Sequence, residues 1–148
     1  MESSDTFNFT EIQGDLFTDH PPGDSLAHCI SEDLRMGKGI ADIFKKKFRG
    51  LQELKEQNKK VGQVAYLERD GRYIFYIITK EKYFHKPSKA NFERALNDLR
   101  VVCEEMGVKN LSIPRIGTGL DKLPLEYVHN VIDATFQGSD MRILMYYL

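Results

Sequence analysis

The sequence predicts an α/β fold, a three-layer α/β/α sandwich with a mixed central sheet. In the second half of the chain, segments with the apolar pattern of strands alternate with segments of helical pattern, as in parallel strands joined by helices. Before them, residues 64–69 and 73–79 flank Asp70-Gly71, a dipeptide that favours the type I′ turn of an antiparallel hairpin. A sheet that combines both pairings and carries helices on both faces accounts for these observations.

Local patterns define the elements of the first half of the chain. Residues 7–12 mix aromatic, β-branched and polar side chains, which favours a strand, and residues 14–23 are expected to form a loop. Residues 25–30 are a short apolar run and predict a second strand. Apolar residues then recur at helical spacing over residues 40–54, with a break expected at Gly50.

The second half continues with helices that have clear start and stop signals. After Pro87-Ser88, apolar residues keep one helical face until Gly107, where the helix is expected to end. Residues 111–113 predict a short strand, and Pro124 is expected in the first turn of the next helix. Residues 141–147 predict the last strand.

Size and composition indicate one globular domain. With 148 residues, of which 41% are hydrophobic and 29% charged, the chain is expected to form a single domain over residues 1–148, with residues 1–6 as a flexible tail. A domain of this size can act as a monomer, which is the expected state. We find neither a secretory signal nor an apolar segment of membrane-spanning length, so no membrane partner is expected.

Charge and cysteine content exclude several classes of function. The 21 Lys and Arg residues nearly balance the 22 Asp and Glu residues, and the net charge of −1 gives no general attraction to nucleic acid. Direct nucleic-acid binding is therefore not expected, and any site for an anion must be built locally. Cys29 and Cys103 match no disulfide framework or zinc spacing, so we expect a reducing intracellular compartment and no metal.

Three loops that follow predicted strands are the candidate binding elements. They contain Gly14-Asp15, residues 35–40 and residues 116–120, and ligands of α/β sheets bind at such carboxyl ends of strands. Glycines allow a phosphate to approach backbone N–H groups without the help of lysines. A single glycine pair is more simply an ordinary turn, but Gly37 with Gly39 and Gly117 with Gly119 form two pairs behind two strands. Neither loop has the Walker or the dinucleotide-binding spacing, which disfavours a P-loop NTPase and a Rossmann dehydrogenase.

These segments resemble a macrodomain, the α/β/α family that binds ADP-ribose. The resemblance rests on Gly14-Asp15-Leu16 after the first strand, the glycine loop 35–40 before a helix, and Ile116-Gly117-Thr118-Gly119 after a strand. Within the family, the chain is most similar to the terminal ADP-ribose protein glycohydrolases, which also deacetylate O-acetyl-ADP-ribose. Its segments that carry this closer match are 25–33, 36–40, 44–48, 69–73 and 114–121.

The resemblance implies a set of site residues. It assigns catalysis to Lys80 and Asp121, and it implies that Asp15 contacts the adenine amino group. Position alone would instead make Lys80 a solvated lysine, and Asp15 and Asp121 turn or capping residues. The implied ligand contacts are Asp15, Leu16, Ser31, Met36, Gly37, Gly39, Ile40, Pro114, Ile116, Gly117, Thr118, Gly119 and Leu120.

The chain also departs from many catalytic macrodomains. Those proteins carry an Asn-Ala-Ala-Asn run and a triple glycine, where this chain has residues 28–31, His-Cys-Ile-Ser, and Gly37-Lys38-Gly39. Their asparagine-dependent water chemistry therefore does not transfer. His28 is expected to be a buried histidine with satisfied hydrogen bonds, and Tyr146 and Tyr147 are expected either beside adenine or in the core.

The resemblance implies covalent catalysis by an amine. Lys80 would attack the anomeric carbon and form a lysyl–ADP-ribose adduct, with Asp121 transferring protons. The attacking amine must be neutral, and partial burial or a neighbouring positive charge such as Lys82 favours that form. The basic run Lys45-Lys46-Lys47 is expected to be a solvated helix face, and its alternative role is to steer polyanionic ADP-ribose chains.

The expected function is a hydrolase that removes terminal mono-ADP-ribose from glutamate and aspartate side chains and deacetylates O-acetyl-ADP-ribose. Two alternatives remain: a reader that binds ADP-ribose without turnover, and a phosphatase that acts on ADP-ribose 1″-phosphate. No cofactor is expected. The expected partners are ADP-ribose, O-acetyl-ADP-ribose, ADP-ribosylated proteins and poly-ADP-ribose chains, in the nucleus and cytoplasm and in the DNA damage response.

Overall fold

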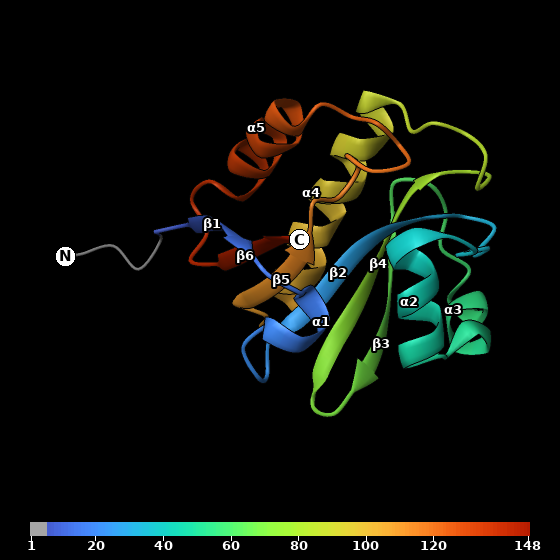
Figure 1. Ribbon diagram of the computed structural model, residues 1–148, viewed down its shortest axis with the longest axis horizontal. Coiled ribbons are helices and arrows are strands. Elements are labelled where there is room, and N and C mark those ends of the chain that lie inside the picture. Colours follow the sequence, from blue (N-terminus) through green and yellow to red (C-terminus); the bar gives the residue numbers. More distant parts are fainter. Residues whose placement is uncertain (1–5) are drawn as a thin grey trace.

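A six-stranded mixed sheet runs through the computed structural model, which describes residues 6–148 (Figure 1). The strand order is β1-β6-β5-β2-β4-β3. Only β3 and β4 pair in the antiparallel sense, and the other neighbours are parallel, so the predicted mixed sheet is confirmed. The strands are β1 (Asn8–Gln13), β2 (Ser25–Ser31), β3 (Val64–Arg69), β4 (Arg72–Lys80), β5 (Asn110–Pro114) and β6 (Arg142–Tyr147).

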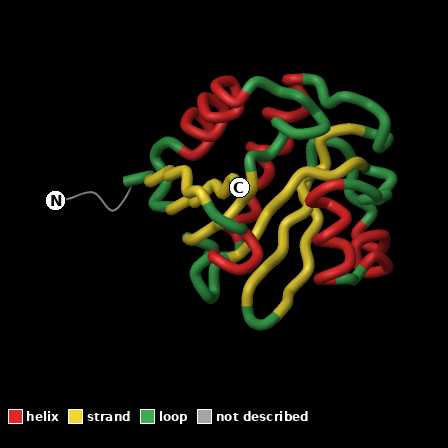
Figure 2. Tube along the Cα trace, in the orientation of Figure 1, coloured by secondary structure: helices red, strands yellow, loops and turns green. Residues whose placement is uncertain are grey.

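Helices cover both faces of this sheet, as the three-layer prediction requires (Figures 1 and 2). One hydrophobic core joins the sheet to α4 and α5 and includes the fully buried Phe92 and Phe136. The second core, on the opposite face, contains Leu16 of α1, Phe44 of α2 and Leu54 of α3. The helices are α1 (Leu16–Asp19), α2 (Gly39–Phe48), α3 (Leu51–Gln57), α4 (Lys89–Glu105) and α5 (Leu125–Phe136).

Several local sequence signals are confirmed by the backbone. The Ser88 hydroxyl accepts a hydrogen bond from the backbone N–H of Asn91 at the start of α4. Asp70 and Gly71 have φ angles of +57° and +79°, as a type I′ turn requires between β3 and β4. The helix predicted over residues 40–54 is divided at Arg49-Gly50, which separates α2 from α3.

Two local predictions were wrong. The loop predicted over residues 14–23 contains α1, whose N-cap Asp15 accepts a hydrogen bond from the backbone N–H of Phe17. Four residues are too few for a helical apolar period to be recognised in the sequence. Pro124 precedes α5 instead of lying in its first turn, because its ψ angle of 138° is extended. The flexible tail expected for residues 1–6 lies outside the described residues except for Thr6.

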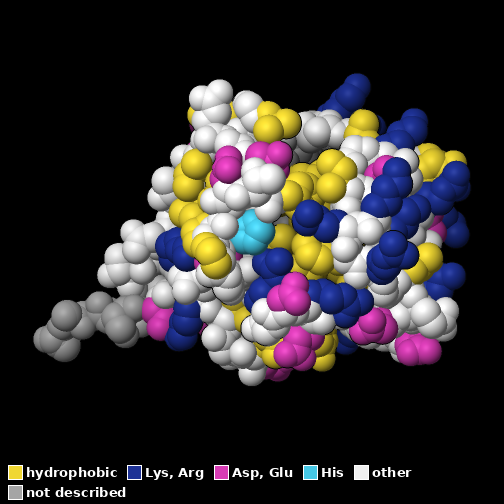
Figure 3. Space-filling view, turned by 60° about the horizontal axis from the view of Figure 1, so that its bottom comes forward, with side chains coloured by type: hydrophobic (Ala, Val, Ile, Leu, Met, Phe, Trp, Pro, Cys, Tyr) yellow, Lys and Arg dark blue, Asp and Glu magenta, His cyan; other side chains and the backbone are white. Residues whose placement is uncertain are grey.

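The basic run Lys45-Lys46-Lys47 lies on the outer side of α2. Lys46 forms an exposed ion pair with Asp42 at 3.0 Å, and the Lys47 ammonium lies 5.8 Å from the centre of the Phe17 ring. Figure 3 shows Lys and Arg side chains gathered toward the side on which α2 and α3 lie. These contacts fit the predicted solvated helix face. No helix within residues 6–148 combines the length and apolar character needed to cross a membrane.

A bidentate ion pair stabilises the sheet at its amino-terminal edge. The Asp24 side chain, only 4% exposed, accepts hydrogen bonds from Arg142 Nη1 and Nη2 at 2.6 and 2.9 Å. It also accepts one from the Ser112 hydroxyl at 2.8 Å. The carboxylate therefore joins the segment before β2 to β5 and β6.

Replacing Asp24 with Ala should destabilise the protein strongly, because it leaves Arg142 without its partner and Ser112 without an acceptor. We expect the free energy of unfolding in urea to fall by about 2–4 kcal/mol. The matched control is Asp140→Ala, which breaks an exposed pair with Lys109 and should cost far less stability than Asp24→Ala. Equal losses in the two variants would contradict this account of the fold.

Candidate active site

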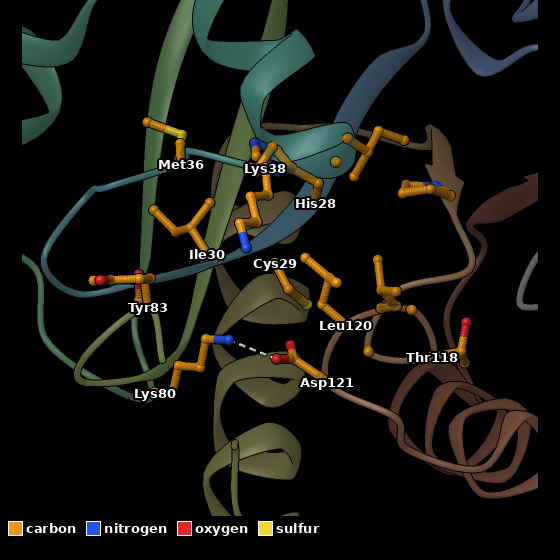
Figure 4. Close-up of a pocket in the computed structure, with 18 of the residues that line it drawn as sticks. His28, Cys29, Ile30, Met36, Lys38, Lys80, Tyr83, Thr118, Leu120 and Asp121 are labelled. Carbon is orange, nitrogen blue, oxygen red and sulfur yellow. Dashed lines mark hydrogen bonds and ion pairs between the residues drawn. The ribbon is translucent and has the colours of Figure 1, made fainter. Parts of the chain in front are cut away.

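A cavity of about 480 Å³ opens where β2, β4 and β5 end (Figure 4). Its size lies within the usual range of small-molecule sites. Ser31 and Lys80 end neighbouring strands, because β2 and β4 are parallel and these residues are partners in the register. The lining consists of residues 28–31, residues 35–41, Lys80, Tyr83 and residues 114–121.

Lys80 and Asp121 lie in contact inside this cavity. The Lys80 ammonium donates a hydrogen bond to Asp121 Oδ1 at 2.6 Å, although the residues are 41 positions apart (Figure 4). Their side chains are only 13% and 14% exposed. A proton can pass directly between groups at this distance, so the pair has the geometry of an amine with its own acid–base partner.

The loop after β5 exposes backbone N–H groups to the cavity. Gly117 has a φ angle of +75°, and a Cβ there would lie 3.0 Å from the Leu123 side chain and 3.1 Å from Phe92. The Leu123 N–H donates to the Gly117 carbonyl at 2.8 Å, which closes the turn. Among residues 6–148, the N–H groups of Gly119 and Leu120 find no acceptor, so they can bind an oxyanion.

The amino terminus of α2 also lines the cavity, and a helix start carries N–H groups that can bind an anion. Its N-cap, Lys38, makes no side-chain capping hydrogen bond, and Figure 4 shows the Lys38 side chain pointing into the cavity. Just before it, Met36 has a φ angle of +44°, a left-handed conformation that is rare for a residue with a side chain. Such strain often accompanies loops that are shaped for binding.

The charges that line the cavity are mostly positive. Asp121 is the only acidic residue among the lining residues, against four cations: Arg35, Lys38, Lys80 and Arg115. The chain as a whole has a net charge of −1, so the positive charge is local. This is the locally built anion site that the composition predicts.

Comparisons with known proteins identify the family. The family model described as Macro domain matches residues 27–132. The chain belongs to the macro domain family. It is 52% identical to "ADP-ribose glycohydrolase OARD1" of Bos taurus, over 99% of this chain and 96% of that protein.

Two solved structures share the fold of this macro domain. "Macrodomain of Thermus aquaticus DarG" has a TM-score of 0.84 and 22% identity, with 97% of this chain and 100% of that chain covered. "Thermosipho africanus DarTG in complex with ADP-ribose" has a TM-score of 0.81 and 19% identity, covering 94% of this chain and 41% of that chain. At these identities, the likeness establishes the fold.

Most predicted site residues of the macro domain line the cavity. They are Ser31, Met36, Gly37, Gly39, Ile40, Lys80, Pro114, Ile116, Gly117, Thr118, Gly119, Leu120 and Asp121. Asp15 and Leu16 do not line it: Asp15 caps α1, and Leu16 is buried in the second core. Tyr146 is buried in the core, whereas Tyr147 lies under the Arg115 guanidinium, 4.0 Å from the ring centre.

Other cavity residues were not predicted as site residues from the sequence. Lys38 stands between two glycines, where a lysine is usually solvated, and Tyr83 follows β4 without a motif. Cys29 lies in an apolar strand and gives no signal of its own. The clue for Lys38 was its place within the glycine loop. The direction of the Lys38 side chain depends on the backbone conformation of residues 34–39, and the sequence pattern does not predict that conformation.

Cys29 and His28 are both held in their neutral forms. Burial raises the pKa of the Cys29 thiol; the negative charge of Asp121 raises it further, and Lys80 opposes this. Burial lowers the pKa of His28 to about 3. Its ring stacks on the Phe44 ring, with 3.8 Å between the ring centres, and neither ring nitrogen has a hydrogen-bond partner within the described structure. His28 is therefore buried as expected, but the expected hydrogen bonds are not present among residues 6–148. Burial therefore keeps the Cys29 thiol from forming the reactive thiolate.

Arg115 anchors the start of the glycine loop. Its guanidinium donates to Glu11 Oε1 of β1 at 2.5 Å, and the other Glu11 oxygen contacts His129 of α5. Burial opposes the ionisation of Glu11, but the hydrogen bonds from Arg115 and His129 outweigh it and hold the pKa of Glu11 below its ordinary value. Glu11 therefore ties the loop to two elements of the scaffold.

This pKa shift predicts a pH-dependent contribution to stability. A carboxyl group with a lowered pKa stabilises the fold above its unfolded pKa, near 4.5, and this contribution is lost as the pH falls through the lower folded value. Glu11→Gln should lower the free energy of unfolding in urea by about 2 kcal/mol at pH 7 and by much less at pH 3.

The control for this measurement is Glu104→Gln, which removes a charge from the exposed pair with Arg100. That variant should change the unfolding free energy by less than about 1 kcal/mol at pH 7. A Glu11→Gln effect of the same size at both pH values would show that the ionised carboxylate is not what stabilises the loop.

Proposed function

We propose that this macro domain removes terminal mono-ADP-ribose from glutamate and aspartate side chains of proteins and deacetylates O-acetyl-ADP-ribose. The observation that carries the proposal is the 2.6 Å contact between Lys80 and Asp121 inside the glycine-lined cavity. The hydrolase class is supported by the identity of 52% with an ADP-ribose glycohydrolase over nearly the whole chain.

The cavity supplies what a diphosphate requires. The glycine loop and the amino terminus of α2 both line it and have N–H groups without acceptors among residues 6–148, and Lys38 adds a cation without a paired carboxylate there. The proposal agrees with "Thermosipho africanus DarTG in complex with ADP-ribose", a structure in which 41% of the chain shares this fold.

The first half of the reaction transfers the sugar to the lysine. Asp121 accepts a proton from Lys80, and the neutral amine attacks the anomeric carbon of the distal ribose. A bond forms between Lys80 Nζ and that carbon while the bond from the carbon to the ester oxygen breaks. The leaving group takes the electron pair and departs as a free carboxylate.

The second half returns the lysine to its first state. A water molecule attacks the same carbon, and the bond to Lys80 Nζ breaks. Asp121 returns to the amine the proton that it accepted in the first half, and its carboxylate then accepts a proton from the attacking water and releases it to solvent, so that the same carboxylate serves both steps. The product is ADP-ribose, and no cofactor enters the balance.

Removal of either member of the pair should abolish turnover but leave binding. We expect Lys80→Ala to lower kcat on an ADP-ribosylated glutamate peptide by at least about 1000-fold, and Asp121→Ala by about 100-fold. The dissociation constant of ADP-ribose, measured by calorimetry, should stay within about threefold. Lys109→Ala and Asp140→Ala are matched controls, because they break an exposed Lys–Asp pair with the same 2.6 Å separation.

The alternatives predict other results. A protein that binds ADP-ribose equally well in all variants but releases none from the peptide is a reader. Phosphate release from ADP-ribose 1″-phosphate that persists in Lys80→Ala indicates a phosphatase. Action on poly-ADP-ribose chains, a role in the DNA damage response, and a nuclear and cytoplasmic location belong to the same proposal.

A further inference from the structure

Exposed apolar side chains stand at the mouth of the cavity. Tyr83 and Phe84, on the loop after β4, are 48% and 67% exposed, and Leu120 of the glycine loop is 65% exposed. In Figure 4, Tyr83 and Leu120 lie on opposite sides of the Lys80–Asp121 pair. Apolar side chains that cluster beside a cavity in this way indicate a binding surface. We call Tyr83, Phe84 and Leu120 the rim.

Hydrogen bonds hold the rim in place. The Asp33 carboxylate accepts hydrogen bonds from the Tyr83 N–H at 2.9 Å and from the Ser31 hydroxyl at 2.5 Å. The Lys86 ammonium donates to the Leu120 carbonyl at 2.7 Å, which connects the loop after β4 to the glycine loop. The rim is therefore ordered before a ligand arrives, and this lowers the entropy lost on binding.

The arrangement of the rings favours a polypeptide over a nucleic acid. The Tyr83 and Phe84 rings meet edge to face, with an interplanar angle of 89°, and His85 contacts Phe84 at 75°. The Arg35 guanidinium lies 4.6 Å above the Tyr83 ring and covers one face of it. These rings form no parallel platform for stacked bases, but they offer edges against which aliphatic side chains can pack.

The charge around the rim selects for an acidic ligand. Four exposed cations lie close to rim residues in the chain or in space: Arg35, Lys82, Lys86 and Lys122. The exposed acids there are Glu81 and Asp33, and the Asp33 carboxylate is already engaged by Tyr83 and Ser31. Basic side chains around an apolar contact are complementary to an acidic polypeptide segment.

We propose that the rim docks the acidic polypeptide segment on either side of the modified side chain. This inference rests on the proposed function, in which a protein carboxylate leaves from the Lys80–Asp121 pair. The polypeptide that carries this carboxylate must cross the mouth of the cavity, where the rim lies. The rim would thus determine which protein substrates are hydrolysed, while the cavity binds the ADP-ribose common to all of them.

Steady-state kinetics on three substrates test the proposal. They are an ADP-ribosylated glutamate peptide with acidic flanks, the same peptide with neutral flanks, and O-acetyl-ADP-ribose, which has no polypeptide. Phe84→Ala should raise KM for the acidic peptide about tenfold and leave O-acetyl-ADP-ribose kinetics unchanged. Phe84→Leu should recover part of the loss, because it restores apolar surface.

Charge reversal tests the choice of an acidic ligand. Lys82→Glu should remove the preference for acidic over neutral flanks, measured as the ratio of kcat/KM on the two peptides, in which any effect of Lys82 on Lys80 cancels. The controls should behave like wild type. They are Val101→Ala, which shortens another exposed apolar side chain, on α4, and Lys59→Glu, a charge reversal beyond α3.

Each other outcome overturns the inference. Unchanged peptide kinetics in an active Phe84→Ala variant would refute the docking role of the rim and leave the proposed function intact. An equal loss on all three substrates would place Phe84 in the ADP-ribose site instead. A loss confined to an ADP-ribosylated single-stranded DNA oligonucleotide would identify a nucleic acid as the occupant. Wild-type protein that hydrolyses none of the substrates would overturn the proposed function, and the rim with it.

Discussion

The parallel pairing of β4, β2 and β5 is the constraint on which the rest of the structure depends. Parallel neighbours end at the same edge of a sheet, so the residues that leave these strands meet there. Lys80 comes from the end of β4, and Asp121 follows the glycine loop that leaves β5. Without this shared edge, two side chains 41 positions apart would not form a contact at 2.6 Å.

The neutral chain and its positive cavity follow from the same arrangement. The backbone supplies much of the anion-binding capacity, through the glycine loop and the amino terminus of α2. The remainder comes from Arg35 and Lys38, because the other two cations of the cavity, Lys80 and Arg115, are paired with Asp121 and Glu11. Such an arrangement provides a local site for a diphosphate in a chain whose net charge is only −1.

Local sequence signals predicted the elements, and contacts distant in sequence decided the details of the site. Ser88 caps α4 and Asp70-Gly71 turns the hairpin because each acts on its own neighbours, so these features are readable from a few residues. The orientation of Lys38 depends on a strained loop that includes Met36, and no short pattern records it. For Asp15 the short motif was recognised, but the motif gave no sign that the Asp15 carboxylate caps α1.

The most direct test of the lysine mechanism is intact-mass spectrometry of the Asp121→Ala variant after incubation with ADP-ribose. Loss of the Asp121 carboxylate removes the charge that favours the ammonium form of Lys80, so solvent can take the proton and the adduct should form, but no acid–base group remains to resolve it. The account predicts a mass increase of ADP-ribose less one water that maps to Lys80 and is absent from Lys80→Ala. Labelling at another residue, or no labelling of Asp121→Ala while wild-type protein is active, would contradict the proposed nucleophile.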